Sequence, residues 1–304
     1  NNDMVTQIEV GVSTKLDSFS AGRDAAREAC YHLKEHPDIL FVFISPIFEQ
    51  EEVIKGIRSV AKEGLLAGCS SVSSISSKGY FLGAVSVCAI SSENIIFSSD
   101  VGQHITRNAR SAGNNSVKEL VNLKNSDRQL CIMFTDSLSG NMADVLRGAQ
   151  EALGTSFPII GGSGTDNFQF QKTYQYFNNS ILTGSVVSVL VRGNINIGTG
   201  IAHGWQPIGK PHKITKFNSN VIREIDRRPA VELYNEYLGK EHGDLNKEGI
   251  GKIGCNYPLG VNIKGKNKYL TRSPLRIENE ENLVFNAEMP EREDVNLMIG
   301  DKNM

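Results

Sequence analysis

The sequence lacks an excess of charge of either sign, and this bears on its partners. Its 304 residues include 32 Lys and Arg against 34 Asp and Glu, which gives a formal net charge of −2 at pH 7. Neither half of the chain holds a sustained run of one sign. Nucleic-acid-binding proteins draw much of their affinity from clustered cations that neutralise phosphates. The composition therefore argues against a nucleic-acid partner.

Long apolar runs and paired cysteines are also missing. No stretch approaches the ~20 apolar residues that a helix needs to cross a bilayer, and the polar start NNDMVTQIEV has no signal-peptide pattern. We therefore expect no membrane segment. The five cysteines are odd in number and include no C-x-x-C pair, which indicates free thiols in a reducing compartment. A cytoplasmic protein is the expectation.

What the sequence does contain is an alternation of apolar strands and amphipathic helices. DILFVFIS (38–45) is continuously apolar, as a strand covered on both faces must be. The helix predicted over 49–64 has acidic residues in its first turn and ends at a glycine, which suits the helix dipole and the C-cap. LLAGCSSV (65–72) is then a second buried strand. This pattern is typical of an α/β protein.

The same pattern returns in the middle of the chain. RQLCIMFTD (128–136) is a strand, GNMADVLRGAQEALG (140–154) a helix, and FPIIGGSGTD (157–166) a strand that ends in small residues. A further alternating strand follows each copy, at 82–90 and 182–191. Matched features at offsets of roughly 90 to 100 residues predict an internal duplication. The expected fold is a duplicated strand-helix-strand core with a largely buried sheet.

The composition changes near residue 218, and we place a domain boundary there. Residues 1–217 form the predicted duplicated domain, and residues 218–304 a smaller α+β region. RPAVELYNEYLG (228–239) predicts a helix with Pro229 in its first turn. The rest is rich in Gly, Asn and Lys, with short strand signals such as LVFNAEM (283–289). This region has few apolar runs for an independent core, so we expect it to pack on the duplicated part or to be incomplete.

Small and hydroxyl-bearing residues follow the last strand of each strand-helix-strand unit, and they form our candidate site. In parallel sheets, ligands bind outside the carboxyl ends of the strands. Small side chains there leave room and expose backbone N–H groups, whereas Ser and Thr add adaptable hydrogen bonds. We predict a binding site for a small polar ligand, closed by a histidine and the only tryptophan. Its predicted residues are Gly68, Cys69, Ser70, Ser71, Gly161, Gly162, Ser163, Gly164, Thr165, Asp166, His203 and Trp205. The alternative, that the glycines only serve tight turns, stays open.

Several alternatives involve catalysis or phosphate binding at or near these segments. A nucleophile elbow at Ser163 would make the protein a serine hydrolase, but the G-x-S-x-G frame lacks its final glycine because Thr165 stands there. A phosphate-binding P-loop is excluded because no Gly-Lys-Ser/Thr follows. Asp136 suits a loop or helix cap better than acid-base chemistry. Cys69 has no basic neighbour in sequence to lower the pKa of its thiol, so we expect it to be inert. The prediction is a non-enzymatic binding protein.

A further alternative is haem. His203 lies between small residues in GIAHGW, next to Trp205, where an imidazole has room to project. The six histidines form no metal-ligand spacing, and we expect structural roles for His104, His212 and His242. We therefore predict no metal and no cofactor, with haem bound through His203 as an alternative.

Taken in order, several segments resemble the FIST domain family of sensory modules. They are DILFVFIS, LLAGCSS, FPIIGGSGTDN, GSVVSVLVRGNINIGTGIAHGWQPIGKPHKIT and VIREIDRRPAVELYNEYLG. The first four resemble the family's N-terminal region, and the last resembles the start of its C-terminal region. The family's C-terminal region normally continues beyond the point matched by LMIG, whereas this sequence ends at Met304, so a ligand site shared by the two regions is in doubt.

The resemblance implies intracellular sensing of a small molecule such as an amino acid. It also implies output through a kinase, cyclase or chemotaxis module, and some members of the family bind haem and report nitric oxide. The signal would leave this chain through such a partner or through a homodimer. The family has no catalytic motif that could be transferred to these residues.

Overall fold

The computed structural model describes residues 6–123, 127–238, 245, 249–263, 268–289 and 294–300. The chain divides into two compact units: the first unit comprises residues 1–139 and 144–198, and the second comprises residues 140–143 and 199–304. The division falls at residue 198 because β13 (Trp205–Asn218) pairs with strands of the second unit. The boundary that we predicted at residue 217 lies at the end of this strand.

The first unit contains two large sheets that repeat one connectivity, besides the two-stranded pair of β4 (Ser73–Ser76) and β5 (Gly79–Leu82). The first sheet has the order β1-β6-β2-β3-β10-β11, and the second has the order β7-β12-β8-β9. In each sheet a parallel pair, β2 with β3 or β8 with β9, lies beside antiparallel strands. The strands of the first sheet are β1 (Thr6–Ser13), β2 (Ile39–Ile44), β3 (Leu65–Ser70), β6 (Val85–Ser92), β10 (Gln175–Phe177) and β11 (Ser180–Leu182). Those of the second are β7 (Ile95–Gly102), β8 (Arg128–Thr135), β9 (Ile159–Ser163) and β12 (Val186–Gly193).

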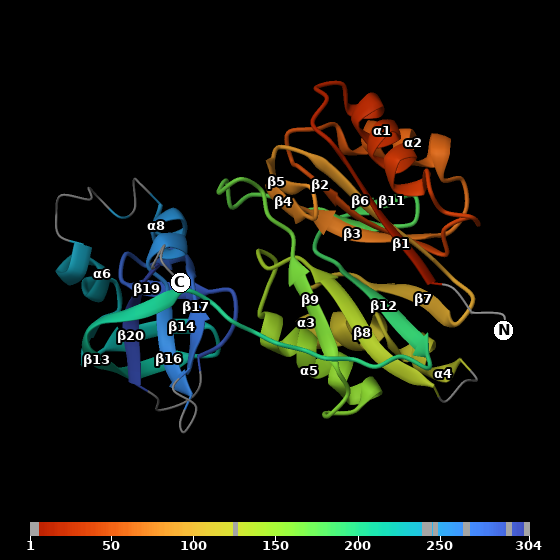
Figure 1. The fold of residues 1–304 in the computed structure, drawn as a ribbon. Coiled ribbons are helices and arrows are strands. Elements are labelled where there is room, and N and C mark those ends of the chain that lie inside the picture. Colours follow the sequence, from red (N-terminus) through yellow and green to blue (C-terminus); the bar gives the residue numbers. More distant parts are fainter. Residues whose placement is uncertain are drawn as a thin grey trace. The chain divides into compact units, whose positions relative to one another are not determined.

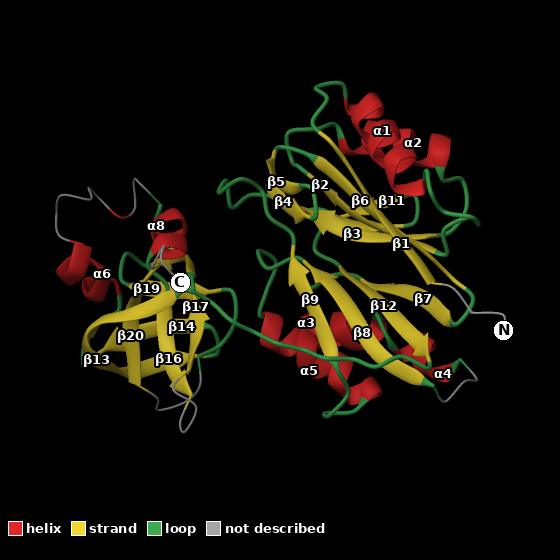
Figure 2. Ribbon diagram, viewed as in Figure 1, coloured by secondary structure: helices red, strands yellow, loops and turns green. Residues whose placement is uncertain are grey.

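Helices cover the outer faces of both sheets, as Figures 1 and 2 show. The helices of the first copy are α1 (Ser18–Cys30) and α2 (Gln50–Val60), and those of the second are α3 (Ala109–Asn115), α4 (Lys118–Asn122) and α5 (Met142–Leu153). One buried cluster lies between the first sheet and its helices, and a second, which includes Phe41, Phe134 and Val189, lies between the two sheets. The predicted α/β class is confirmed.

Each copy packs its two main helices at unusually close range, and glycine makes this contact possible. A Cβ added to Gly22 of α1 would lie 2.2 Å from the backbone oxygen of Val53 on α2. In the second copy, a Cβ on Gly113 of α3 would lie 1.9 Å from the oxygen of Val145 on α5. Real Cβ atoms do not approach backbone so closely. The close contact is therefore repeated in both copies.

The second unit has a sheet and a core of its own, so our expectation that its few apolar runs could not form an independent core is wrong. Its strands follow the order β17-β16-β20-β13-β14-β19-β18, with β15 beside β14. Besides β13 these are β14 (Val221–Ile225), β15 (Arg228–Pro229), β16 (Leu259–Ile263), β17 (Lys268–Arg272), β18 (Pro274–Glu278), β19 (Asn282–Phe285) and β20 (Asp294–Gly300), with helices α6 (Val231–Leu238) and α8 (Ile250–Asn256). Ile222, Leu259 and Phe285 are among its fully buried side chains. The helix predicted over 228–239 is present as α6, but Pro229 is not in its first turn, because Arg228 and Pro229 pair with β14 as β15 and the helix begins at Val231. Residue 239 lies outside the described residues.

Candidate functional site

The two predicted segments, far apart in sequence, are in direct contact within the first unit. The Ser70 hydroxyl at the end of β3 donates to the Thr165 carbonyl at 2.9 Å, and the Thr165 N–H donates to the Ser70 carbonyl, also at 2.9 Å. The Val72 N–H donates to the Thr165 hydroxyl at 3.0 Å. The carboxyl ends of β3 and β9 therefore lie in contact, although the two strands belong to different sheets. The ligand site that we predicted from these segments stays a prediction.

Most glycines in these segments allow backbones to pack closely. A Cβ on Gly68 would lie 1.8 Å from the Val42 oxygen, and one on Gly161 would lie 1.9 Å from the Met133 oxygen. A Cβ on Gly164 would lie 2.9 Å from the Thr173 Cβ. Gly162 differs, because an added Cβ there would have nothing within 4 Å. Among these four glycines, therefore, only Gly162 faces open space.

A network of buried polar side chains links the two copies beneath this contact. The fully buried Gln175 of β10 donates to the Thr173 hydroxyl at 3.0 Å, and the Ser70 hydroxyl also accepts from the Tyr174 N–H. The Ser163 hydroxyl shares a 2.8 Å hydrogen bond with the Thr135 hydroxyl. A serine nucleophile needs an adjacent general base, and Thr135 cannot act as one, so this contact offers no support to the hydrolase alternative.

Asp166 organises the loop that follows β9. Its buried carboxylate accepts from the backbone N–H groups of Phe170 at 3.1 Å, Gln171 at 2.7 Å and Lys172 at 3.1 Å. Three residues of this loop have positive φ, including Asn167 at 57°. The carboxylate therefore supplies acceptors that the turning backbone needs. This position shows a structural role for Asp166; its predicted ligand role stays a prediction.

Asp136 is a loop residue, as we predicted. Its carboxylate accepts from the Leu138 N–H at 3.0 Å, the Ser139 hydroxyl at 2.8 Å and the Gly184 N–H at 2.9 Å. These bonds tie the end of β8 to the turn that precedes β12. With all three donors engaged, the carboxylate supports the loop.

Cys69 lies in β3 between the two sheets, and burial raises the pKa of its thiol to about 12. Because the thiolate is the reactive form, we expect iodoacetamide at pH 8 to leave Cys69 unmodified in the folded chain and to alkylate it in urea. The measurement is mass spectrometry of the tryptic peptides. Cys131 is the matched control, since burial raises the pKa of its thiol to about 12 as well. Rapid labelling of Cys69 in the native protein would contradict this assignment.

His203 and Trp205 belong to the second unit. The exposed His203 ring has its Nε2 2.8 Å from the Tyr269 carbonyl oxygen, and its Nδ1 accepts from the Trp205 N–H at 3.3 Å. Both ring nitrogens are thus engaged, so an iron ligand at His203 would have to give up one of these bonds. That His203 and Trp205 close a site with residues of the first unit stays a prediction. Within the described residues, no group of three or more His, Cys, Asp or Glu side chains could hold a metal ion.

His212 has a structural place, as expected. It is almost fully buried, with Nδ1 2.7 Å from an Asp226 carboxylate oxygen and Nε2 3.0 Å from the Tyr237 hydroxyl. The backbone N–H of Lys213, followed by His212, holds the pKa of Asp226 below its usual value. These contacts join β13, β14 and α6 within the second unit.

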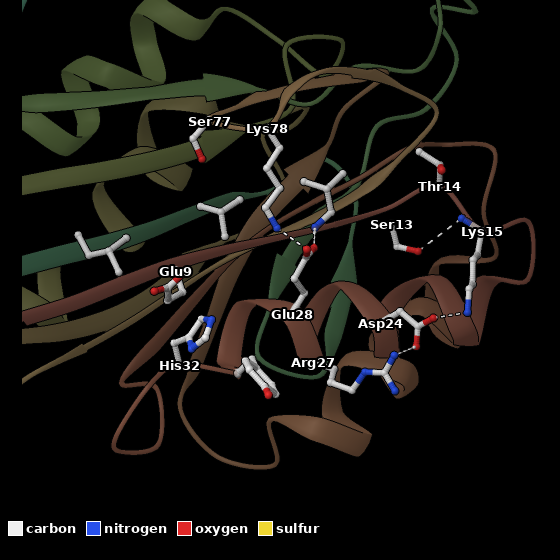
Figure 3. Close-up of a pocket in the computed structure, with 14 residues that line it drawn as sticks. Glu9, Ser13, Thr14, Lys15, Asp24, Arg27, Glu28, His32, Ser77 and Lys78 are labelled. Carbon is white, nitrogen blue, oxygen red and sulfur yellow. Dashed lines mark hydrogen bonds and ion pairs between the residues drawn. The ribbon is translucent and has the colours of Figure 1, made fainter.

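A groove of about 860 Å³ lies along β1 and α1 of the first unit (Figure 3). We call it the β1–α1 groove. Ser77 and Lys78, in the exposed turn between β4 (Ser73–Ser76) and β5 (Gly79–Leu82), are part of its lining. Its lining residues are Ile8, Glu9, Val10, Val12, Ser13, Thr14, Lys15, Asp24, Arg27, Glu28, Tyr31, His32, Ser77 and Lys78.

The β1–α1 groove carries charges of both signs. Lys78 forms an ion pair with Glu28, and the other Glu28 oxygen accepts from the Val12 N–H at 2.9 Å. The Lys78 hydrogen bond, followed by that from Val12, lowers the pKa of Glu28. Lys15 forms an ion pair with Asp24 and is the largest cause of that carboxyl's lowered pKa. Both carboxylates therefore stay ionised at neutral pH.

Sequence reasoning did not find this groove. Its charges come from β1, α1 and the 77–78 turn, and no short motif contains them together. The available signal was weak: Asp24 and Glu28 are four residues apart, which places them on one face of a helix. Such spacing is also common on ordinary solvated helices.

Comparison with known proteins gives one family and two more distant similarities. A family model described as the FIST N domain matches residues 38–228, and one described as the FIST C domain matches residues 230–304. The match begins after β1 and α1, so it excludes most of the groove lining. An uncharacterised protein of Methanocaldococcus jannaschii, MJ1623, is 29% identical over 147 residues. That alignment covers 45% of this chain and 28% of the relative, so the chain spans just over a quarter of that protein's length.

Among solved structures, a cyanuric acid hydrolase from A. caulinodans is similar at a TM-score of 0.36 and 9% identity. The similarity covers 64% of this chain and 72% of that one. At these values it carries no argument about activity. In the part of the chain that the structure describes, no helix is long and apolar enough to cross a membrane.

Proposed function

This chain belongs to the FIST family of sensory signal-transduction modules, with an N domain followed by a C domain, and we propose that it senses amino acids or related zwitterionic metabolites. The observation that supports this ligand class is the mixed charge of the β1–α1 groove. A sensor of this kind binds its ligand without turnover. We therefore propose a binding protein whose output passes to a partner such as a kinase, cyclase or chemotaxis module.

An amino acid carries an ammonium and a carboxylate a few ångströms apart, and the groove offers partners for both. Glu28 and Asp24 suit the ammonium, and Lys78 and Lys15 suit the carboxylate. The volume of about 860 Å³ lies within the usual ~300–1,000 Å³ for small-molecule sites. The ligand would replace the Lys78–Glu28 ion pair, and partly exposed pairs of this kind contribute only ~0–1 kcal/mol. Replacing the Lys78–Glu28 ion pair by contacts to the ligand therefore costs little free energy.

The exchange also suggests how binding becomes a signal. Lys78 lies in the turn of the β4–β5 hairpin, whereas Glu28 lies on α1. A ligand that takes over Glu28 would release the hairpin turn from the helix. Since a ligand shifts an equilibrium only by its difference in affinity between two states, the held and released hairpins are the two states that we propose.

The test is a thermal-shift screen of amino acids, followed by calorimetric titration of each hit. We expect a hit to raise the melting temperature, because a ligand that binds only the folded state stabilises it. Glu28→Gln should weaken binding about tenfold or more, which corresponds to ~1.4 kcal/mol. Lys55→Met is the matched control, because it removes a comparably exposed ion pair with Glu52 on α2.

Outcomes of the titration separate the candidate sites. Binding that is unchanged in Glu28→Gln but lost in Ser163→Ala would move the site to the end of β9, where we predicted it from sequence. A screen without hits would contradict the proposed ligand class. The haem alternative predicts a Soret band in haem-supplied protein that is lost in His203→Ala.

A further inference from the structure

The first sheet ends in a hairpin supplied by the second copy. In β10, Gln175 lies opposite Cys69 of β3, Tyr176 opposite Gly68, and Phe177 opposite Ala67. The turn of this hairpin is held at its far end, where Asn178 Oδ1 accepts from the Leu66 N–H at 3.2 Å. Arg58 of α2 donates to Asn179 Oδ1 at 2.9 Å. The β10–β11 hairpin therefore covers the outer edge of β3.

The β4–β5 hairpin of the first copy has the same design. Ile75 lies opposite Tyr80, as Tyr176 lies opposite Ile181 in β10–β11. Both hairpins have a two-residue turn, and a glycine with positive φ follows each of them, Gly83 at 63° and Gly184 at 58°. Yet β4 and β5 form a separate two-stranded sheet. The two hairpins therefore correspond, but only one of them extends a larger sheet.

The unextended hairpin exposes apolar side chains. Ile75 is 85% exposed, Tyr80 64% and Leu82 65%. The corresponding residue of Ile75 in the other hairpin, Tyr176, is fully buried. An isolated two-stranded hairpin with an apolar surface gains stability when a further strand or sheet covers it.

The strand that corresponds to β3 in the second copy is β9, and its outer edge is open. Among the described strands, β9 pairs with β8 alone. Its Ile160 side chain is 41% exposed, and Gly162 faces open space. Unpaired edges of this kind are templates for strand addition.

We propose that the β4–β5 hairpin of one copy of this chain adds to the β9 edge of a second copy, and reciprocally. Gly161 corresponds to Gly68, since each lies against the backbone of the preceding parallel strand. The pairing of β10 with β3 then places Ile75 opposite Gly161 and Ser74 opposite Gly162. The completed sheet, β7-β12-β8-β9-β4-β5, has the same order as the first sheet.

The connections favour a second copy over the same chain. Eleven residues, 164–174, join β9 to β10, and these carry the second copy's hairpin across to the first sheet. Only two residues, 71 and 72, join β3 to β4. Short connections hinder crossing within one molecule and promote exchange of an element between two.

Polar groups at the hairpin turn are complementary to the new neighbour. Lys78 takes the place of Asn179, which accepts from Arg58 on α2. On α5 the position of Arg58 is taken by Gln150, because each lies two residues after the corresponding glycines, Gly56 and Gly148. Gln150 can accept from Lys78 once Lys78 leaves Glu28, whereas Glu151 beside it already pairs with Arg110. In the first sheet the helix residue Arg58 donates and the turn residue Asn179 accepts. In the proposed contact the turn residue Lys78 donates and the helix residue Gln150 accepts.

The test uses full-length chains that each carry one new cysteine. Ser74→Cys and Gly162→Cys proteins are mixed, oxidised mildly and resolved on a non-reducing gel. We expect a disulfide-linked dimer, because directly opposed strand residues have the Cα separation that a disulfide needs. Ser76→Cys mixed with Gly162→Cys is the register control and should link far less. Wild-type protein oxidised in parallel reports any linking by the five native cysteines.

Other outcomes overturn the proposal. No linked species from the Ser74→Cys and Gly162→Cys mixture would exclude the exchange. A chain that carries both Ser74→Cys and Gly162→Cys is a further test. If its disulfide forms only within one chain, the hairpin reaches the β9 of its own molecule and the exchange is excluded. Adding Ile75→Lys to the Ser74→Cys chain should abolish the dimer without unfolding the monomer, since Ile75 is exposed in the separate hairpin. Undiminished linking in that variant would also count against the register.

Discussion

Gly22→Ala is expected to lower the free energy of unfolding by about 3 kcal/mol. The added Cβ would lie 2.2 Å from the backbone oxygen of Val53, so α1 and α2 would have to move apart. Helix propensity alone predicts the opposite sign, because Ala is better than Gly inside a helix by ~1 kcal/mol. The sign of the effect therefore decides whether helix packing or propensity dominates at this position.

Urea denaturation followed by circular dichroism measures this change. Gly113→Ala, in the corresponding place of the second copy, should lose at least as much, since its Cβ would lie 1.9 Å from the Val145 oxygen. Lys55→Ala, at an exposed position on α2, is the control and should change stability by less than ~1 kcal/mol. A Gly22→Ala protein as stable as the wild type would contradict the close contact of the helices.

Asp166→Ala should lower the free energy of unfolding by about 2–3 kcal/mol. Three backbone N–H groups lose a charged acceptor. The loop conformation, which includes the positive φ of Asn167, also loses the hydrogen bonds that stabilise it. The loss is smaller than the sum of three bonds because water can reach part of the opened loop. Asp166→Asn should lose less, since the amide oxygen still accepts.

The same variant separates a structural from a ligand-binding role for Asp166. Thermal unfolding measures stability, and Glu52→Ala controls for the removal of an exposed carboxylate. If Asp166 held only a ligand, the variant without ligand would be as stable as the wild type and would fail only in titrations. We expect instead that the Asp166→Ala protein is less stable than the wild type, and that its folded fraction still binds ligand in the β1–α1 groove.

The elements of the first unit could be predicted from sequence because their signals are local. DILFVFIS is apolar throughout, and β2 occupies Ile39–Ile44 within it. The helix predicted over 49–64 is present as α2, Gln50–Val60. Repetition of these signals also predicted the duplication. The pairing of β10 with β3 could not be predicted, because it joins strands from different copies and has no short-range signal.

The candidate site shows the same limit at a finer scale. Ser70 and Thr165 lie in contact although their strands belong to different sheets, which the rule for a single parallel sheet does not predict. The rule also did not show that Gly68 and Gly161 are needed for backbone packing, because this depends on the position of a single absent Cβ. The β1–α1 groove was missed since Lys78 and Glu28 are fifty positions apart in the chain and meet only after folding.

The crossing of β10 onto β3 has a consequence for synthesis on the ribosome. Gln175 lies 106 positions after its partner Cys69, from the difference between 175 and 69. While the ribosome translates that interval, the outer edge of β3 in the first copy has no pairing strand, and such an unpaired edge can aggregate with other nascent chains. The edge of β3 is therefore covered only after β10 has been synthesised. A stalled or prematurely terminated product that lacks β10 would be prone to aggregation.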